Sequence, residues 1–592
     1  MNNSSCRIVR SSTTAILAAL LCAPLTVFAQ WTFLDGAKVH PDFHGQVPRK
    51  SDVIFSTRFK RDNAPDVARA YGATRIEWCY STDPAFIQTL KMAAPWFGGT
   101  LSSTLALPGD EGIALDLKGR PIVAPWMKSW GAKWISAANP ATRQFLDAMV
   151  QRLLDLGVSS IQVDDPLLQY ASTNWGGDFS VGALEGFRRF LVDYPNKAVL
   201  RSAGIHDPET LDYKRYLEKA YNIQTAKEYA ERFRNLPTTP LWLEYHKEAV
   251  VSHYSRLKSL LGSMKGKAVP LSMNLALMGP DGTKAQFDLV PFVDYAMVET
   301  RMDDFDLVLL QAATYRALGV GYVPSILPAT KAENRLAIAS LYAMGAQPLV
   351  PWDVYVNNGP DKLPTRFFGT PEDYGDLYRF VKDNANFLDN LDELAVVGIV
   401  VPVNSYQPKE TLDFVRRLSM AKIPFAVLPL GGKGGRYALN PKRANRFRLL
   451  ATVNPLADFS PDDRAALRGL SVELRSAVDI SDEMLRSISP YRFSRDSATR
   501  LIARANSQQP SNLVLHVIRP NRYDRSDAVS SCERSIAFQA NVLGPGLLKT
   551  AQWRTPRHAV DLQLVVSDLG VMVELPDCDE WGTVVIRVTN QS

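Results

Sequence analysis

Short apolar runs alternate with amphipathic helical patterns along the first two thirds of the chain. Eight of these runs have the length and the β-branched or aromatic content of strands. They are residues 52–58, 74–80, 99–106, 159–165, 268–275, 293–299, 320–326 and 347–354. The intervening segments have helical spacing; in one of them Asn139 is a candidate N-cap, Pro140 suits the first turn, and Gly157 ends the pattern. Strand–helix units repeated eight times predict a TIM (β/α)8 barrel.

Two long insertions interrupt this alternation. Residues 107–138 follow the third expected strand and are rich in Trp and Gly, and residues 166–245 follow the fourth and are partly helical. Both come after the carboxyl ends of strands, which is where (β/α)8 barrels place their functional sites. We therefore expect the chemistry of this chain near these two insertions.

The hydrophobic pattern changes after residue 392. It first indicates strand, helix, strand, strand and helix, which predicts a small flavodoxin-like α/β domain. After residue 498 apolar and polar positions alternate in several segments, which predicts a C-terminal antiparallel β-sandwich. The expected domains are a catalytic barrel at 30–392, the flavodoxin-like domain at 393–492 and the β-sandwich at 493–592.

Residues 1–29 have the pattern of a secretory signal peptide. Arg7 and Arg10 precede an apolar run that ends in Val27-Phe28-Ala29, small residues at the spacing that a signal peptidase reads. The run is too short for a membrane anchor. We expect cleavage after Ala29 and a secreted or periplasmic protein without a membrane anchor.

Composition and cysteine usage narrow the class of protein. The chain has 592 residues, is 46% hydrophobic and 22% charged, and carries a net charge of +6 without a concentrated Lys/Arg block. These values are typical of a globular protein and give no support to nucleic-acid binding. Cys79, Cys532 and Cys578 remain after the signal peptide is removed. In an oxidising compartment the last two either pair or stay as thiols, and both alternatives remain open.

Strand alternation places carboxylates inside the expected barrel. In segment 159–165, Ile161 and Val163 form an apolar face that should pack on the helices. Asp164 lies on the opposite, inward face at the carboxyl end of the strand. Asp165 then faces away or begins the outgoing loop, where capping or orienting the insertion is its expected role.

Other strands deliver polar groups to the same rim. In segment 293–299 the inward face ends on Glu299. The remaining strands contribute Arg75 and Glu77, Asn274, and Asp353. Because each such group is costly to desolvate without a partner, a barrel without chemistry has little reason to gather all of them. For any single one of them, a structural ion pair at the rim is the alternative.

Two carboxyl groups that face a sugar ring are the machinery of glycoside hydrolysis. The sequence predicts Asp164 as the nucleophile and Glu299 as the proton donor, with Asp165 and Glu77 in reserve. Arg75 is expected to hold a neighbouring carboxylate in its ionised form.

Tryptophans suggest how a sugar would be held. Trp126, Trp130 and Trp134 are spaced four residues apart in a glycine-containing loop, and Trp352 lies near the last expected strand. Indole rings at a barrel mouth suit the apolar faces of pyranoses, although packing beneath the loops is the alternative for each ring. The expected substrate-binding residues are Glu77, Arg75, Asn274, Asp353, Trp126, Trp130, Trp134 and Trp352.

Motifs for other chemistry are weak. His246 and His253 are seven residues apart in a helical pattern and lack the spacing of an HExxH zinc site. The sequence has no GxSxG elbow, P-loop or Rossmann glycine pattern. We therefore expect neither a metal nor a cofactor.

The carboxylates at the strand ends resemble those of known barrels. A carboxylate after the fourth strand, in "QVDD", and another after the sixth, in "MVET", resemble those of the retaining α-glycosidase barrels, such as melibiases and the dextranase family. That resemblance implies Asp164 as the nucleophile and Glu299 as the proton donor. The melibiase motif is Lys-Tyr-Asp, whereas here it is Gln162-Val163-Asp164. The middle domain resembles that of family-42-type β-galactosidases, whose Asn-Glu pair is absent here.

These patterns favour an exported glycoside hydrolase that cleaves an oligo- or polysaccharide by a retaining mechanism at an α-linkage. One alternative is a β-galactosidase-like glycosidase with the same fold. Another is a non-catalytic protein of carbohydrate binding or exopolysaccharide assembly. The expected partner is a carbohydrate, and a homo-oligomer is possible on this evidence.

Overall fold

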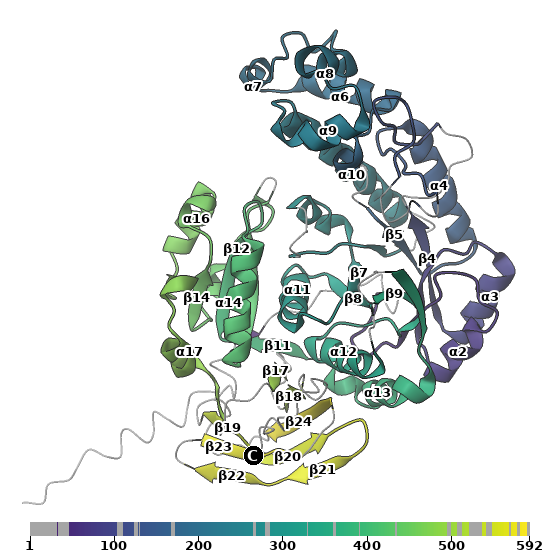
Figure 1. The fold of residues 1–592 in the computed structure, drawn as a ribbon. Helices are drawn as coiled ribbons and strands as arrows, with labels where there is room; N and C mark the ends of the chain where they lie inside the picture. Colours follow the sequence, from purple (N-terminus) through teal and green to yellow (C-terminus); the bar gives the residue numbers. More distant parts are fainter. Residues whose placement is uncertain are drawn as a thin grey trace, which may run out of the picture.

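The computed structural model describes most of the chain (Figure 1). The described residues are 32–33, 47–102, 111–123, 128, 131–166, 172–263, 268–278, 284–327, 330–358, 363–389, 391–432, 435–493, 499–505, 512–519, 535–539, 548–567, 570–576 and 580–588. The expected signal peptide at 1–29, the loop residues Trp126 and Trp130, and the cysteines Cys532 and Cys578 lie outside them.

A curled sheet of parallel strands forms the centre of the molecule. Its strands are hydrogen-bonded in chain order, from β2 to β8. They are β2 (Ile54–Ser56), β3 (Arg75–Cys79), β4 (Trp96–Ser102), β5 (Ser160–Asp164), β6 (Leu271–Met273), β7 (Tyr295–Thr300) and β8 (Gly321–Ile326). Each strand lies within one of the expected segments, except that β4 begins three residues earlier and β7 ends one residue later than expected.

The eighth barrel position is filled by a short segment, residues 347–350. The amide of Leu349 donates to the carbonyl of Pro324 in β8 (2.9 Å), and the amide of Val350 donates to the carbonyl of Ile54 in β2 (2.7 Å). The expected strand at 347–354 is wrong in its second half, because Pro351 has no N–H to donate and the chain then leaves the barrel. It continues as the antiparallel hairpin of β9 (Trp352–Asn358) and β10 (Leu363–Phe368).

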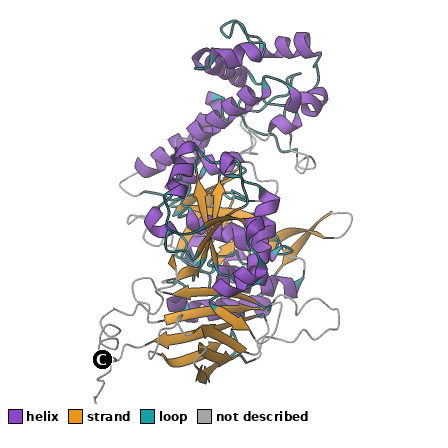
Figure 2. Ribbon diagram, turned by 90° about the vertical axis from the view of Figure 1, so that its left-hand side faces the viewer, coloured by secondary structure: helices purple, strands orange, loops and turns teal. Residues whose placement is uncertain are grey.

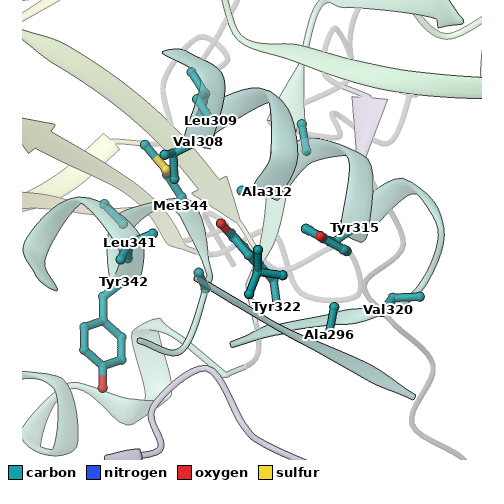
Figure 3. Packing of buried hydrophobic residues seen from close by; sticks show 14 of the residues in the cluster. Ala296, Val308, Leu309, Ala312, Tyr315, Val320, Tyr322, Leu341, Tyr342 and Met344 are labelled. Atoms are coloured by element: carbon teal, nitrogen blue, oxygen red, sulfur yellow. The ribbon is translucent and has the colours of Figure 1, made fainter. Parts of the chain in front are cut away.

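Helices cover the outer face of this sheet. They are α2 (Ala64–Tyr71), α3 (Pro84–Ala93), α4 (Pro140–Asp155), α10 (Thr239–Ser263), α11 (Phe305–Ala317), α12 (Lys331–Met344) and α13 (Pro371–Asp383). The side chain of Asn139 caps α4 by accepting from the amide of Ala141, as expected. Figure 3 shows Tyr315 of α11 beside Tyr322 of β8, and their rings stack with centroids 4.6 Å apart. This packing fixes the helices against the strands that end at the barrel mouth.

The insertion after β5 is a helical unit with its own core. It contains the 3₁₀ segments η3 (Ser172–Trp175) and η4 (Phe233–Asn235) together with α6 (Val181–Asp193), α7 (Lys197–Ser202), α8 (Tyr213–Tyr221) and α9 (Ala226–Arg232). Phe187 and Trp242 pack edge to face at its centre, with ring centroids 4.7 Å apart. The unit stands at the end of the molecule opposite the C-terminal sheets (Figure 2). Helix α10 connects it back to the barrel.

The middle part of the chain forms a parallel sheet in the order β13-β12-β14-β15, which is the flavodoxin-like order. Its strands are β12 (Val397–Pro402), β13 (Phe425–Leu430), β14 (Leu449–Thr452) and β15 (Leu474–Ser476). Its helices are α14 (Pro408–Met420), α15 (Pro441–Ala444), α16 (Pro461–Arg468) and α17 (Asp482–Ile488). The unit is attached to the barrel at two points. Arg416 donates to Asp304, the residue that caps α11 (2.6 Å), and Tyr437 donates to the carbonyl of Phe287 in the segment before β7 (2.8 Å).

Two antiparallel sheets lie at the C-terminal end. One has the order β1-β11-β17-β18-β24-β20-β21 and the other β16-β19-β23-β22. The first contains β1 (Thr32–Phe33), β11 (Asp392–Ala395), β17 (Arg500–Ala505), β18 (Asn512–Ile518), β20 (Leu548–Arg554), β21 (Ala559–Leu562) and β24 (Trp581–Val588). The second contains β16 (Tyr491–Phe493), β19 (Ser535–Gln539), β22 (Leu564–Ser567) and β23 (Gly570–Glu574). The expected architecture of a barrel, an α/β unit and a β-sandwich is confirmed.

The sheets and the barrel share a core. Trp581 of β24 packs edge to face on Phe380 of α13, with ring centroids 4.9 Å apart. Beside them Arg335 of α12 forms ion pairs with Asp376 and Glu580, both at 2.6 Å. Strands β1 and β11 also join the first C-terminal sheet, although both come before residue 493, where the β-sandwich was expected to begin. Those boundaries remain predictions.

Candidate active site

The barrel interior is polar near its middle layer. Glu77 has no exposed surface, and its carboxylate is paired with the guanidinium of Arg75 (2.8 Å). The same carboxylate also accepts from the hydroxyls of Ser160 and Tyr295, each at 3.1 Å. The inward orientation expected for these residues is therefore found. However, Arg75 and Glu77 face each other inside a closed layer, and this placement argues against contact with substrate.

Gly98 on β4 makes room for this network. A Cβ atom at this position would lie 1.9 Å from Oε2 of Glu77. Any side chain here would therefore displace a carboxylate that has no alternative position in the packed interior. The glycine and the buried ion pair belong to the same structural layer, below the mouth of the barrel.

Asp164 ends β5 at the mouth, as the alternation predicted. Its Oδ1 accepts from the amide of Asn274 (2.9 Å) and from the backbone N–H of Asp165 (3.0 Å). Its Oδ2 accepts from the hydroxyl of Tyr80, which follows β3. Burial and the charge of Asp164 raise the pKa of Tyr80 well above its usual value, so the phenol stays a donor. Three donors thus hold one carboxylate in a fixed position.

Asp165 follows directly after the end of β5. Its φ is +51°, a left-handed conformation that interrupts the alternation of the strand directly after Asp164. Burial, and then the charges of Asp164 and Glu299, raise the pKa of Asp165 well above its usual range. Strand β5 ends at Asp164, so Asp165 begins the outgoing loop, which is one of the two expected alternatives. The raised pKa further indicates that Asp165 is close to both other carboxylates.

Glu299 on β7 brings the third carboxylate. Its Oε1 accepts from Nη2 of Arg58 (3.0 Å), which follows β2, and the same nitrogen donates to the hydroxyl of Ser325 (3.0 Å). The guanidinium of Arg58 lies over the indole of Trp78, 4.2 Å from the ring centroid. The indole N–H of Trp78 in turn donates to the hydroxyl of Tyr80 (2.9 Å). These contacts connect Glu299 with Asp164 around the rim.

Backbone strain gathers at this rim. Of the six described non-glycine residues with positive φ, Asn222 and Lys422 follow helices. The other four lie at or beyond the ends of the barrel strands: Trp78 (+54°), Asp165 (+51°), Met278 (+60°) and Asp353 (+54°). Each such conformation costs on the order of 1–3 kcal/mol and persists where the surrounding structure demands it, as at functional sites. The strain therefore marks the same end of the barrel as the carboxylates.

The remaining expected site residues that the structure describes are not presented to solvent. The side chain of Asp353 is fully buried and paired with Nε of Arg61 (3.0 Å). Trp352 is 4% exposed and stacks on Phe55, with ring centroids 4.9 Å apart. Trp134 is 1% exposed and packs against Trp175 at 5.0 Å. For these two tryptophans the structure favours packing, the alternative named above, over sugar binding.

The sequence reasoning missed Arg58, Trp78 and Tyr80. Each of them lies at or just beyond the carboxyl end of β2 or β3. The same kind of position, the carboxyl end of a strand, led to the prediction of Asp164 and Glu299. Including every polar or aromatic residue at a strand end would have found them. The strained conformation of Trp78 carries no such signal in the sequence.

The site thus combines the easily protonated carboxyl group of Asp165 with two carboxylates that accept hydrogen bonds. Arg58 donates to Glu299, and neutral groups donate to Asp164. Neighbouring carboxyl groups with separated protonation are the arrangement that general acid–base chemistry requires. Within the described residues, no group of three or more His, Cys, Asp and Glu side chains is arranged to hold a metal ion. Nor is any described helix both long and apolar enough to cross a bilayer.

Comparison with known proteins identifies relatives of part of the chain. No family model matches the chain. The alpha-agarase of Alteromonas agarilytica is 23% identical over 368 residues, and that of Thalassotalea agarivorans is 22% identical over 338 residues. These matches cover 56% and 53% of this chain and 25% and 23% of the relatives. The chain thus spans about a quarter of the length of the curated relatives it matches.

A solved structure agrees over nearly the whole chain. Alpha-L-fucosidase isoenzyme 2 from Paenibacillus thiaminolyticus has a TM-score of 0.60 and 11% sequence identity, and the match covers 92% of this chain and 100% of that one. At this identity the likeness shows the fold. The chain has the fold of a barrel glycoside hydrolase, which confirms the resemblance at that level. The finer resemblance to melibiases and family-42-type enzymes stays a prediction.

Proposed function

We propose that this chain is a glycoside hydrolase that cleaves a polysaccharide at the carboxyl-terminal mouth of its barrel. The observation that carries the proposal is the meeting of Asp164, Asp165 and Glu299 at one rim. There burial, and then the charges of Asp164 and Glu299, raise the pKa of Asp165. Glycoside hydrolysis needs this combination of an ionised carboxylate and a protonated carboxyl group on either side of the scissile bond.

Asp164 is the proposed nucleophile. Its carboxylate is fixed by three donors, so little motion is needed before it attacks an anomeric carbon. One of the other two carboxyl groups gives its proton to the leaving glycosidic oxygen. The resulting glycosyl ester with Asp164 is then hydrolysed by water, and the configuration at the anomeric carbon is retained.

The two agarase relatives suggest the substrate. Both are named for an alpha-agarase activity, and their matched regions cover more than half of this chain. We therefore propose agarose, cleaved at an α-linkage, as the first substrate to test. The expected signal peptide supports an exported enzyme, because a polymer of this size has to be cut outside the cell.

Hydrolysis of a panel of polysaccharides, followed by NMR of the product anomer, tests this function. The panel includes agarose, other algal galactans and β-galactosides. We expect the wild-type enzyme to release reducing ends from agarose with retention, and Asp164→Asn to abolish that release. Asp303→Asn is the matched control, because Asp303 is an exposed carboxyl group on the loop after β7.

Each other outcome has a definite meaning. Cleavage of β-galactosides alone would favour the β-galactosidase-like alternative. Binding of agarose without cleavage of any glycan would favour a carbohydrate-binding protein. An initially inverted anomer would rule out the retaining mechanism, and full activity of Asp164→Asn would remove Asp164 from the chemistry.

A further inference from the structure

We propose that Asp165 is the proton donor of this site, and that Arg58 holds Glu299 as an anion beside it. This assignment rests on the proposed function and departs from the roles expected from the sequence, where Glu299 was the donor. It follows from the different surroundings of the three carboxyl groups.

Glu299 has a cationic partner. The ion pair with Arg58 measures 3.0 Å, and the side chain of Arg58 is 11% exposed. The guanidinium is itself fixed, because it lies over Trp78 and donates to Ser325. A carboxylate that faces a fixed guanidinium is stabilised in its charged form and gives up that pairing if it takes a proton. Glu299 is thus suited to remain an anion.

Asp164 accepts from three donors, and all three are neutral. Tyr80, Asn274 and the backbone N–H of Asp165 fill positions on both of its oxygens. Donors of this kind favour the ionised form of the carboxylate that accepts them. A proton on either oxygen of Asp164 would compete with these hydrogen bonds. A proton shared among Asp164, Asp165 and Glu299 is therefore more favourably held by a group other than Asp164.

Asp165 is the carboxyl group that remains. Within the described residues no ion pair is formed by its side chain, which is half-buried. It follows Asp164 with a φ of +51°, and its backbone N–H donates to the Asp164 carboxylate. Burial, and then the charges of Asp164 and Glu299, raise the pKa of Asp165 and favour its protonated form.

The step balances without any added reactant. As Oδ of Asp164 bonds to the anomeric carbon, the bond from that carbon to the glycosidic oxygen breaks, and the carboxyl proton of Asp165 moves to the departing oxygen. Asp165 is then an anion. In the second half it takes a proton from the attacking water, whose oxygen displaces Asp164 from the carbon. Asp165 regains its proton and Asp164 its charge.

Leaving-group and pH dependence test the assignment. On agarose we expect Asp165→Asn to lose activity by about 10²–10⁴-fold and to lose the alkaline limb of the wild-type kcat/KM profile. On 2,4-dinitrophenyl α-glycosides that the wild type cleaves, the same variant should retain most of its kcat/KM, since that leaving group needs no proton. Its kcat should fall, because the glycosyl ester is then hydrolysed without a general base. Azide should rescue Asp165→Asn and give a glycosyl azide of retained configuration. If Glu299→Gln shows this set of properties and Asp165→Asn does not, the assignment is overturned.

A measurement independent of activity separates this inference from the proposed function. Infrared difference spectra at neutral pH between wild type and each variant report the C=O stretch of a protonated carboxyl group. We expect the band in the difference spectrum for Asp165→Asn and its absence for Glu299→Gln and for Asp303→Asn. A band that belongs to Glu299 would refute the inference even if agarose is the substrate. A band that belongs to Asp165 in a protein that cleaves no glycan would refute the function alone.

Arg58 supplies a second arm of the test. Arg58→Met removes the cation from Glu299, so we expect part of the protonated-carboxyl band to move from Asp165 to Glu299, with a shifted alkaline limb of the pH profile. Arg58→Lys keeps a positive charge and should restore the wild-type spectrum. A merely structural role of Arg58 would change stability and leave both the spectrum and the pH profile unaltered, and that result would contradict the role proposed for it.

Discussion

The hydroxyl of Tyr80 donates to Oδ2 of Asp164, which joins the end of β3 to the end of β5 across the intervening strand. Tyr80→Phe removes this hydrogen bond while keeping the ring. A hydrogen bond to a charged group contributes about 1.5–3 kcal/mol, so we expect kcat/KM to fall by about 10–100-fold.

Thermal melting provides the control for Tyr80→Phe, because a large loss of stability would explain the kinetic loss differently. We expect a small change in Tm, since the ring contacts remain. Unchanged kcat/KM in a folded Tyr80→Phe protein would show that the hydroxyl does not position Asp164.

The protonation of Asp165 should also affect stability. In the unfolded chain this carboxyl titrates near 3.8, whereas in the folded protein its pKa is raised. The folded state therefore binds more protons than the unfolded state above pH 3.8, and stability falls as the pH rises through that window, by up to about 1.4 kcal/mol per pH unit. Asp165→Asn should raise Tm more at pH 8 than at pH 4.5, whereas Asp303→Asn should give no such trend. An equal Tm gain at both pH values would contradict the raised pKa.

His246 and His253 of α10 make the fold sensitive to acid. Both are buried, their four ring nitrogens have no hydrogen-bond partner among the described residues, and burial lowers the pKa of each to about 4. The unfolded state binds more protons between pH 4 and 6.5, so stability is lost as the pH falls, by about 1.4 kcal/mol per pH unit for each histidine.

Urea unfolding at pH 7.5 and pH 5 measures this loss. We expect His246→Leu and His253→Leu each to reduce the difference in unfolding free energy between the two pH values. The solvent-exposed His206 offers the control, and His206→Leu should leave the difference unchanged. A wild-type protein that is equally stable at both pH values would contradict the lowered pKa values.

Gly98 and Gly262 form a matched pair for the barrel interior. Gly98→Ala would place a Cβ 1.9 Å from Glu77, whereas nothing lies within 4 Å of a Cβ at Gly262 of α10. We expect Gly98→Ala to destabilise the fold by about 1–3 kcal/mol or more, since it overpacks a closed layer. Gly262→Ala should be neutral or stabilising by up to about 1 kcal/mol. Equal unfolding free energies of the two variants would refute the packing argument.

The position of Asp164 could be predicted because period-two alternation holds along a regular strand. Ile161 and Val163 pack in the outer core with the helices, and Asp164 ends the opposite face. The rule no longer applies one residue later, because alternation holds only while the backbone stays extended and β5 ends at Asp164. A left-handed φ at a single aspartate is not readable from its neighbours.

Tryptophan spacing was a weaker guide than strand position. Trp134 and Trp352 are large apolar rings, and burial of such a ring stabilises the fold whether or not a ligand is present. Similarly, the eighth strand was predicted longer than it is. Its apolar run was read through Pro351, which has no N–H to donate to the sheet. In both cases the residue type was compatible with two environments, and only the tertiary structure decides between them.

Strands β1 and β11 pair with each other, and β11 pairs with β17. The polypeptide therefore enters the terminal sheet before the barrel, returns to it between the barrel and the α/β unit, and ends in it. A gene fragment cut at residue 392 or 493 would leave an open sheet edge, a surface prone to aggregation. The three parts of this chain are interlaced, so they would have to be inherited, exchanged or engineered together.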